Sequence, residues 1–136
     1  MRIEPRGHRD TELLLEKKIT RIIIDSAIEV HKALGPGLLE SAYEKCLGIE
    51  FDIRGIEFKS QVEIPLEYKG TKIKPGYRID LMVENTVILE LKAVETILPI
   101  HQAQLLTYLK LIKKRVGLIL NFNSAIMKNG IKRMVL

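Results

Sequence analysis

Residues 76–95 read GYRIDLMVENTVILELKAVE, and this stretch largely decides the fold. Side chains of a β-strand alternate between the two faces of its sheet. Residues 77–83 and 87–93 both alternate in this way, and residues 84–86 between them are polar and suit a turn. The alternation predicts one apolar face made of Ile79, Leu81, Val83, Val87, Leu89 and Leu91.

The length of the turn decides which residues of the two strands face each other. A two-residue loop would put the apolar residues of the two strands on opposite faces. A three-residue loop at residues 84–86 unites them, in the pairs Val83 with Val87 and Leu81 with Leu89. The same register places Asp80 opposite Glu90, with Lys92 on the same face. We therefore expect the three-residue loop, which brings these three charged residues together.

Two facing carboxylates repel each other, so the pKa of at least one is raised unless a cation compensates. Oxygen ligands of this kind suit Mg²⁺ or Mn²⁺, and a neighbouring lysine can orient a water molecule or stabilise charge on a phosphate. Asp80, Glu90 and Lys92 are thus candidates for a metal-dependent nuclease centre. A solvated polar pair on a strand surface is an equally good interpretation of this stretch alone.

Two predicted helices carry further polar candidates. In the helix expected from Glu40 to about Arg54, Glu40 and Tyr43 lie on one stripe. In the helix that follows Pro99, His101, Gln104 and Tyr108 share a face and could contact a nucleic acid. Each set taken alone is also what an ordinary amphipathic helix shows.

The segment Gly37-Leu-Leu-Glu40-Ser-Ala-Tyr43 resembles the signature of the GxxExxY proteins, a family within the PD-(D/E)XK nuclease superfamily. The likeness covers residues 19–136. Asp80, Glu90 and Lys92 are similar to the D…ExK core of the superfamily, although Ile79 precedes Asp80 where the superfamily name has proline. The sequence QLLTY at residues 104–108 resembles the QxxxY motif of the superfamily's recombination-exonuclease branch.

The resemblance implies an αβββαβ core, of class α/β or α+β, with a mixed central sheet flanked by helices. It also implies catalytic roles for Asp80, Glu90 and Lys92. The implied ligands of Mg²⁺ or Mn²⁺ are Asp80, Glu90, the backbone carbonyl of Leu91, and Glu40. The residues implied to support the site or to bind nucleic acid are Tyr43, Gln104 and Tyr108.

Composition agrees with a nucleic-acid partner. The chain has 136 residues, a net charge of +5 and a pI near 9.4, so a polyanion is a suitable ligand. Basic residues cluster at Lys69, Lys72 and Lys74, at Lys110, Lys113, Lys114 and Arg115, and at Lys128, Lys132 and Arg133. The single cysteine, Cys46, excludes an intramolecular disulfide, and no Cys and His spacing indicates zinc.

The pattern predicts a flexible N-terminal arm over residues 1–12 and a single domain over residues 13–136. We expect a helix over residues 11–33, a strand over 62–68 with a hairpin turn at Lys69 and Gly70, a strand over 116–122, and an edge strand within 130–136. Neither a signal peptide nor a membrane span is evident, so we expect a cytoplasmic protein.

The leading functional hypothesis is a magnesium-dependent deoxyribonuclease that hydrolyses phosphodiester bonds. Two alternatives stay open at this stage. One is a non-catalytic module of the same fold that binds nucleic acid or a partner protein. The other is a structure-specific endonuclease resembling junction resolvases, which usually act as dimers. A homodimer or a partner protein is therefore also left open.

Overall fold

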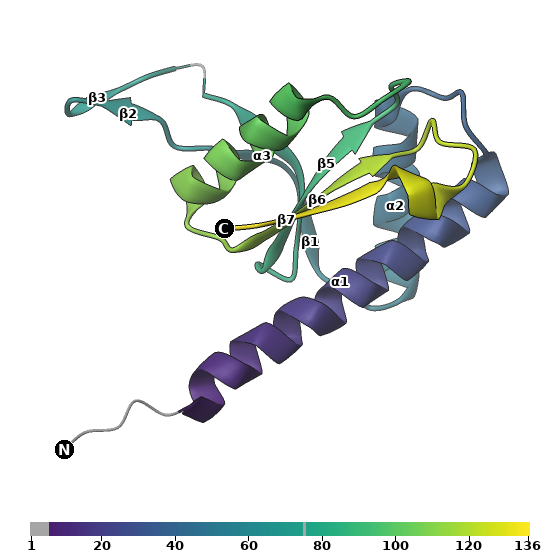
Figure 1. Cartoon of the computed structure of the whole chain (residues 1–136), viewed down its shortest axis with the longest axis horizontal. Coiled ribbons are helices and arrows are strands. Elements are labelled where there is room, and N and C mark those ends of the chain that lie inside the picture. The colour runs from purple at the N-terminus through teal and green to yellow at the C-terminus, as the bar shows by residue number, and fades with distance from the viewer. Residues whose placement is uncertain (1–5, 75) are drawn as a thin grey trace.

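The computed structural model describes residues 6–74 and 76–136, in which three α-helices surround a mixed five-stranded sheet (Figure 1). The helices are α1 (Arg6–Leu34), α2 (Glu40–Ile53) and α3 (Pro99–Ile112). The sheet has the order β1-β4-β5-β6-β7, from β1 (Phe58–Glu63), β4 (Arg78–Val83), β5 (Val87–Lys92), β6 (Val116–Asn121) and β7 (Ile131–Val135). Strands β5 and β6 are parallel, and the other neighbours are antiparallel. This arrangement confirms the expected mixed sheet with helices on its faces.

The hairpin of β4 and β5 has the register that the three-residue loop predicts. Val83 pairs with Val87 and Leu81 with Leu89. Glu84 and Asn85 adopt positive φ angles of 51° and 50°, which let so short a loop reverse the chain. The loop is closed by a 3.0 Å hydrogen bond that the Thr86 N–H donates to the Val83 carbonyl.

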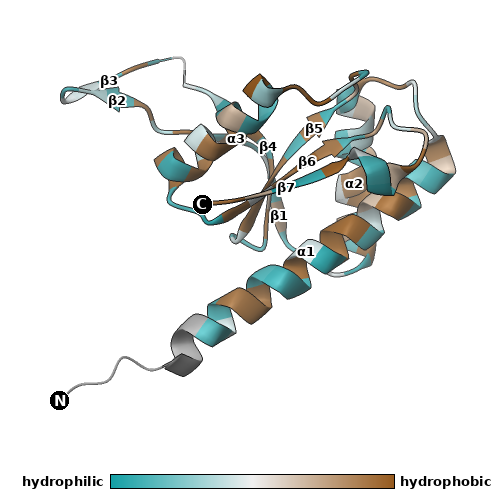
Figure 2. Cartoon of the chain, in the orientation of Figure 1, coloured by the Kyte–Doolittle hydropathy of each residue, from teal (hydrophilic) through white to brown (hydrophobic). Residues whose placement is uncertain are grey.

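The two faces of the sheet carry separate apolar clusters. Helices α1 and α2 cover one face, where residues such as Leu81, Leu89 and Leu120 are buried. Helix α3 covers the other, where Met82 and Ile88 pack with Leu105. Apolar residues accordingly fill the central strands and recur along α1 (Figure 2). Both faces of β4 and β5 are therefore largely buried, and neither face is a solvent-exposed polar surface.

Ile79 does not join the apolar face that the alternation predicts. It packs on the α3 side of the sheet, in a cluster with Ile64 and Tyr108, whereas Leu81 packs on the α1 side. The pairing of β4 with β5 ends at Leu81 and Leu89. Ile79 lies beyond that point, where pairing with β5 no longer fixes which way its side chain faces.

Two elements differ in their bounds from the sequence prediction. Helix α1 begins at Arg6, so residues 6–12 of the expected arm are helical, while residues 1–5 lie outside the described residues. The predicted strand over residues 62–68 is instead β1 followed by the separate strand β2 (Glu67–Tyr68). Strand β2 pairs with β3 (Thr71–Lys72) around the expected turn at Lys69 and Gly70, and the C-terminal edge strand is β7.

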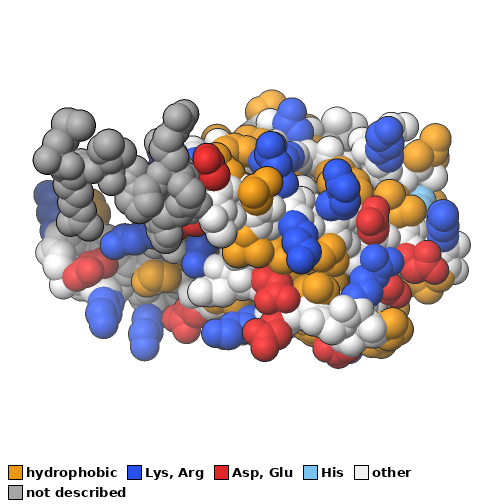
Figure 3. Space-filling view, turned by 90° about the horizontal axis from the view of Figure 1, so that it is seen from below, with side chains coloured by type: hydrophobic (Ala, Val, Ile, Leu, Met, Phe, Trp, Pro, Cys, Tyr) orange, Lys and Arg blue, Asp and Glu red, His pale blue; other side chains and the backbone are white. Residues whose placement is uncertain are grey.

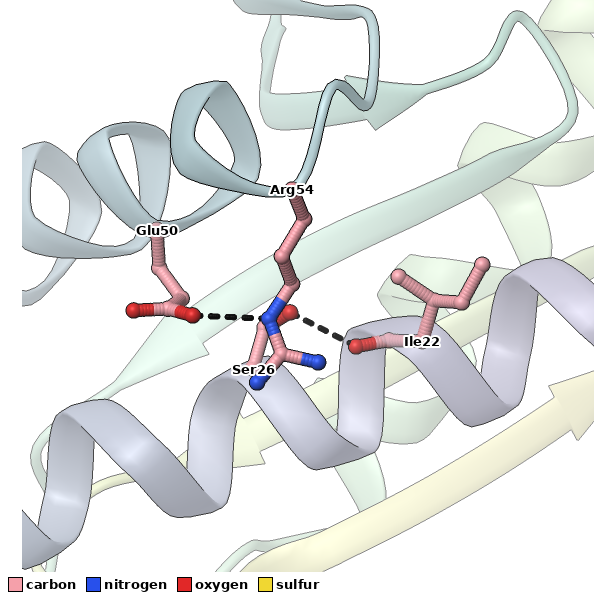
Figure 4. Close-up of polar contacts among 4 residues, drawn as sticks. All are labelled: Ile22, Ser26, Glu50 and Arg54. Carbon is pink, nitrogen blue, oxygen red and sulfur yellow. Dashed lines mark hydrogen bonds and ion pairs between the residues drawn. The ribbon is translucent and has the colours of Figure 1, made fainter.

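Helix α1 is long, and its first turns extend beyond the sheet (Figure 1). Further along, the fully buried Ser26 of α1 donates a 2.7 Å hydrogen bond to the Ile22 carbonyl. At the end of α2, Arg54 forms a 2.7 Å ion pair with Glu50; Figure 4 shows both contacts. Among the described residues, neither α1 nor any other helix combines the length and apolar character needed to cross a membrane.

Candidate active site

The candidate site lies where β4 and β5 separate. Past the Leu81 and Leu89 pair, side-chain carboxylates accept the backbone hydrogen bonds that link the two strands. Oδ2 of Asp80 accepts a 2.8 Å hydrogen bond from the Leu91 N–H, and Oε1 of Glu90 accepts a 3.4 Å bond from the Asp80 N–H. Each carboxylate is thus bound to the opposite strand, and the two face each other across the end of the hairpin.

The electrostatics of this pair reflect burial and like charge. Burial, and secondly the charge of Asp80, raise the pKa of Glu90 to about 8. Burial also raises the pKa of Asp80, against which the Leu91 N–H and the charge of Lys92 act. Lys92 is half-buried and forms no ion pair with either carboxylate in the described part of the chain. Negative charge at the pair is therefore incompletely compensated by the chain itself.

Glu40, the first residue of α2, also reaches the site. Its Oε1 accepts a 3.2 Å hydrogen bond from the Ala93 N–H, one residue after β5. The negative charge of Glu40 raises the pKa of both Asp80 and Glu90. Glu40 is an exposed residue, yet its carboxylate lies against the end of β5 rather than pointing into bulk solvent.

Tyr43 holds the turn from which Glu40 emerges. Its side chain is fully buried and stacks on Phe122, with ring centroids 4.4 Å apart. The hydroxyl donates a 2.5 Å hydrogen bond to the Gly35 carbonyl and accepts a 3.2 Å bond from the Leu38 N–H. Gly35 and Gly37 have φ angles of 68° and 103°, which favour glycine. In the GxxExxY segment, the tyrosine therefore fixes the turn and the glutamate extends to the sheet.

Helix α3 brings Tyr108 to the same end of the sheet. Tyr108 is mostly buried, and its ring lies 5.9 Å from that of Tyr77. Burial, and secondly the charge of Glu90, raise the pKa of Tyr108, whereas a hydrogen bond with the Gln104 side chain acts in the opposite direction. His101 instead accepts a 3.0 Å hydrogen bond from the Leu98 N–H at the start of the helix. Gln104 and Tyr108 therefore act as a pair beside Glu90, and His101 belongs to the helix start.

Sequence reasoning missed two residues beside Asp80. Gln61 of β1 has a φ of 53°, and the pairs on either side of it, Ser60 with Leu81 and Val62 with Ile79, place it opposite Asp80. Its Nε2 donates a 2.7 Å hydrogen bond to Oε1 of Glu44, and a hydrogen bond of the Gln61 side chain also lowers the pKa of Asp80. Glu44 follows Glu40 by one helical turn, a spacing that could have identified it. No sequence signal marks Gln61.

Asn121 at the end of β6 was also missed, and it fixes the chain that leaves β5. It is buried, with 3% of its surface exposed. Its Nδ2 donates a 2.8 Å hydrogen bond to the Val94 carbonyl, and its Oδ1 accepts bonds from the N–H groups of Val94 at 3.1 Å and Asn123 at 3.3 Å. Asn121 therefore holds the segment that follows Lys92 and Ala93. The Glu40 carboxylate contacts the Ala93 N–H immediately before this segment.

The oxygen atoms of this site suit a divalent cation that keeps some water ligands when it binds. Among residues 6–74 and 76–136, no group of three or more His, Cys, Asp or Glu side chains is arranged to hold a metal ion. Two oxygen donors with raised pKa values, Asp80 and Glu90, nevertheless stand opposite each other. Mg²⁺ commonly binds through one or two carboxylates and completes its shell with water and substrate phosphate. Leu91 lies between Glu90 and Lys92, and its N–H is engaged by Asp80.

Comparison with known proteins gives one match. A family model described as the PD-(D/E)XK nuclease superfamily matches residues 17–134. No curated protein and no solved structure matches the chain. The matched range contains Glu40, Asp80, Glu90, Lys92 and Tyr108, and so includes the whole of the site described above.

Proposed function

Because the chain belongs to the PD-(D/E)XK nuclease superfamily, we propose that it is a magnesium- or manganese-dependent nuclease that hydrolyses phosphodiester bonds of DNA. Nuclease activity is what the superfamily suggests. The observation that supports a working centre in this chain is the facing pair of Asp80 and Glu90, with Lys92 near enough to lower the pKa of both. Their uncompensated negative charge favours a bound cation.

In this proposal, Asp80 and Glu90 hold the metal, and the Leu91 carbonyl and Glu40 add ligands. When bound, the metal supplies positive charge that polarises the phosphate and acidifies a water molecule. Lys92 orients the attacking water and stabilises negative charge on the phosphate. The carboxyl groups of Asp80 and Glu90 are held in place before substrate arrives, because backbone N–H groups of the opposite strand bind both side chains.

The remaining site residues act through these groups. Tyr43 positions Glu40 by closing the turn before α2, and its burial makes it a positioning residue rather than a contact for nucleic acid. Gln104 and Tyr108 support Glu90 from α3, and the partly exposed Gln104 can also contact a DNA strand. We further propose that the chain is a GxxExxY protein, that residues 13–136 form one domain, and that it acts in the cytoplasm as a homodimer or with a partner protein.

A cleavage assay tests the proposal. The full chain is incubated with linear, circular, single-stranded and branched DNA in magnesium, manganese or EDTA. Asp80→Asn and Lys92→Ala are compared with the unchanged chain and with Lys59→Ala, since Lys59 is an exposed lysine of the same sheet. We expect metal-dependent cleavage that both site variants reduce at least about 100-fold, as loss of a catalytic group commonly does, and that Lys59→Ala leaves unchanged.

Each other outcome has a defined meaning. Cleavage that survives Asp80→Asn and Lys92→Ala belongs to another site or to a contaminant and contradicts the proposal. Cleavage confined to branched DNA identifies a structure-specific endonuclease. Binding of DNA without cleavage of any substrate, combined with metal binding that does not depend on Asp80, identifies a non-catalytic module of this fold.

A further inference from the structure

A groove lies between α1 and the edge strand β7, away from the candidate active site. It has a volume of about 330 Å³ and is lined by Lys17, Thr20, Arg21, Ile24 and Arg133. Three of these five residues are cations, and none is an acid. Arg133 is on β7, which β6 separates from the strand β5 that carries Glu90 and Lys92. The groove shares no lining residue with the candidate active site, so it is a separate site.

Thr20, one of the residues that line this groove, carries a polar group without a partner. Its side chain is 8% exposed, and its Oγ1 is the one buried side-chain nitrogen or oxygen without a hydrogen-bond partner in the described part of the chain. A buried threonine or serine in a helix normally satisfies its hydroxyl with the carbonyl four residues earlier. Ser26 does so with Ile22 on the same helix (Figure 4). Leaving a buried hydroxyl unpaired is costly, and a ligand that accepts its hydrogen bond removes that cost.

The charges around Thr20 are also uncompensated. Within the described residues, no ion pair is recorded for Lys17, Arg21 or Arg133. Glu16, which precedes Lys17, is engaged by Arg115, whose Nε lies 3.3 and 3.2 Å from its two oxygens. Figure 3 views the molecule from the side along which α1 runs and shows Lys and Arg side chains, together with Asp and Glu, among apolar ones on that face. Positive charge therefore surrounds a hydroxyl donor that has no acceptor.

From this combination we infer that Lys17, Thr20, Arg21 and Arg133 form a binding site for a phosphate group. Arginine forks match the paired oxygens of a phosphate, lysine adds charge, and the threonine hydroxyl donates to a third oxygen. The phosphate belongs either to a nucleic-acid backbone or to free inorganic phosphate. Only the nucleic-acid source rests on the proposed function, because phosphate binding as such does not require DNA cleavage.

The test titrates the ¹⁵N-labelled full chain with inorganic phosphate at constant ionic strength and follows amide chemical shifts. Thr20→Val removes the hydroxyl and keeps the shape, and Arg133→Gln removes one charge. Lys18→Gln is the matched control, because Lys18 is an exposed cation of the same helix that does not line the groove. We expect saturable shifts at the amides of Thr20 and Arg133, and an affinity about tenfold weaker in Thr20→Val and Arg133→Gln. Lys18→Gln should bind like the unchanged chain.

Thermal unfolding without phosphate checks that the variants are folded. Thr20→Val should melt no lower than the unchanged chain, because the substitution removes an unpaired buried hydroxyl. Absence of saturable shifts in the unchanged chain overturns the inference. So does a Thr20→Val or Arg133→Gln variant that is folded and binds phosphate as tightly as the unchanged chain.

A second arm identifies the source of the phosphate. Binding of a labelled DNA duplex is measured by fluorescence anisotropy in EDTA, which prevents cleavage. A greater loss of DNA affinity for Arg133→Gln than for Lys18→Gln supports a backbone phosphate. In Arg133→Gln the slope of log affinity against log salt concentration should then fall by about one. Equal DNA affinities with an intact phosphate titration support free phosphate as the ligand. Failure of the nuclease proposal appears only in the cleavage assay, so the two results can be told apart.

Discussion

The raised pKa of Glu90 makes a prediction about folding stability. Glu90 is 7% exposed, and burial together with Asp80 raises its pKa from 4.5 to about 8. Between these two values the folded chain keeps a proton that the unfolded chain releases. Because stability rises with pH only where the unfolded state binds more protons, this group makes stability fall as the pH rises from 4.5 to about 8.

The size of the effect follows from the same two values. At about 1.4 kcal/mol for each pH unit, the interval corresponds to an upper limit of about 5 kcal/mol. Relaxation and water penetration reduce such penalties in real proteins. We therefore expect the isosteric Glu90→Gln variant, which cannot ionise, to be more stable than the unchanged chain by about 2–5 kcal/mol at pH 8. Near pH 4.5, where Glu90 is protonated in the folded chain, the two should be nearly equal.

The assay is urea unfolding of both proteins from pH 4.5 to 9 in EDTA. Using the difference between the two curves removes the contributions of groups that do not interact with Glu90, so it reports the Glu90 and Asp80 pair. The exposed Glu57 supplies the control, and Glu57→Gln should show no such divergence. Parallel curves for Glu90→Gln and the unchanged chain across the whole range would refute the reasoning. Millimolar magnesium at pH 8 should stabilise the unchanged chain more than Glu90→Gln, because the cation offsets the charge that the variant lacks.

Three further substitutions test the framework of the site. Tyr43→Phe removes the hydroxyl that bonds Gly35 and Leu38, so urea unfolding should show a loss of about 1–3 kcal/mol; an unchanged midpoint would contradict the positioning role. Gln61→Gly relieves a φ of 53° but removes the amide beside Asp80. We expect equal or higher stability with slower DNA cleavage, and full cleavage activity would exclude the amide from the site. Asn121→Ala should cost about 2–4 kcal/mol in the same unfolding assay, because it leaves the partly buried N–H and carbonyl groups of Val94 without the partners that Asn121 supplies. The exposed Asn123→Ala should cost less, and equal losses would contradict the role of Asn121.

The pairing of β4 with β5 could be predicted because two independent constraints agree. Alternation fixes which residues of each strand share a face, and the odd loop is the one that unites the apolar sets. The structure confirms the pairs Val83 with Val87 and Leu81 with Leu89. The juxtaposition of Asp80 and Glu90 follows from that register, so it required no knowledge of the rest of the fold.

The edge of the site could not be predicted in the same way. Strand β1 has the burial pattern of a mostly exposed edge, with Phe58 and Val62 as its partly buried apolar residues, so alternation gives it no clear signal. The positive φ of Gln61 breaks its period as well. A positive φ at a glutamine is set by its tertiary surroundings, which a local pattern does not contain. The side on which Ile79 packs depends in the same way on where the ladder of β4 and β5 ends.

The two carboxylates also have a structural duty, and this decides how their roles can be tested. The Leu91 and Asp80 N–H groups lie past the last ladder pair, and the Asp80 and Glu90 side chains accept their hydrogen bonds. An alanine at either position would leave a partly buried N–H unpaired and loosen the strand ends, so its loss of activity would not separate catalysis from folding. Asparagine at position 80 keeps an oxygen acceptor for Leu91 and removes the charge that a cation requires. A folded Asp80→Asn chain without metal-dependent activity would therefore assign Asp80 a chemical role that its structural role cannot explain.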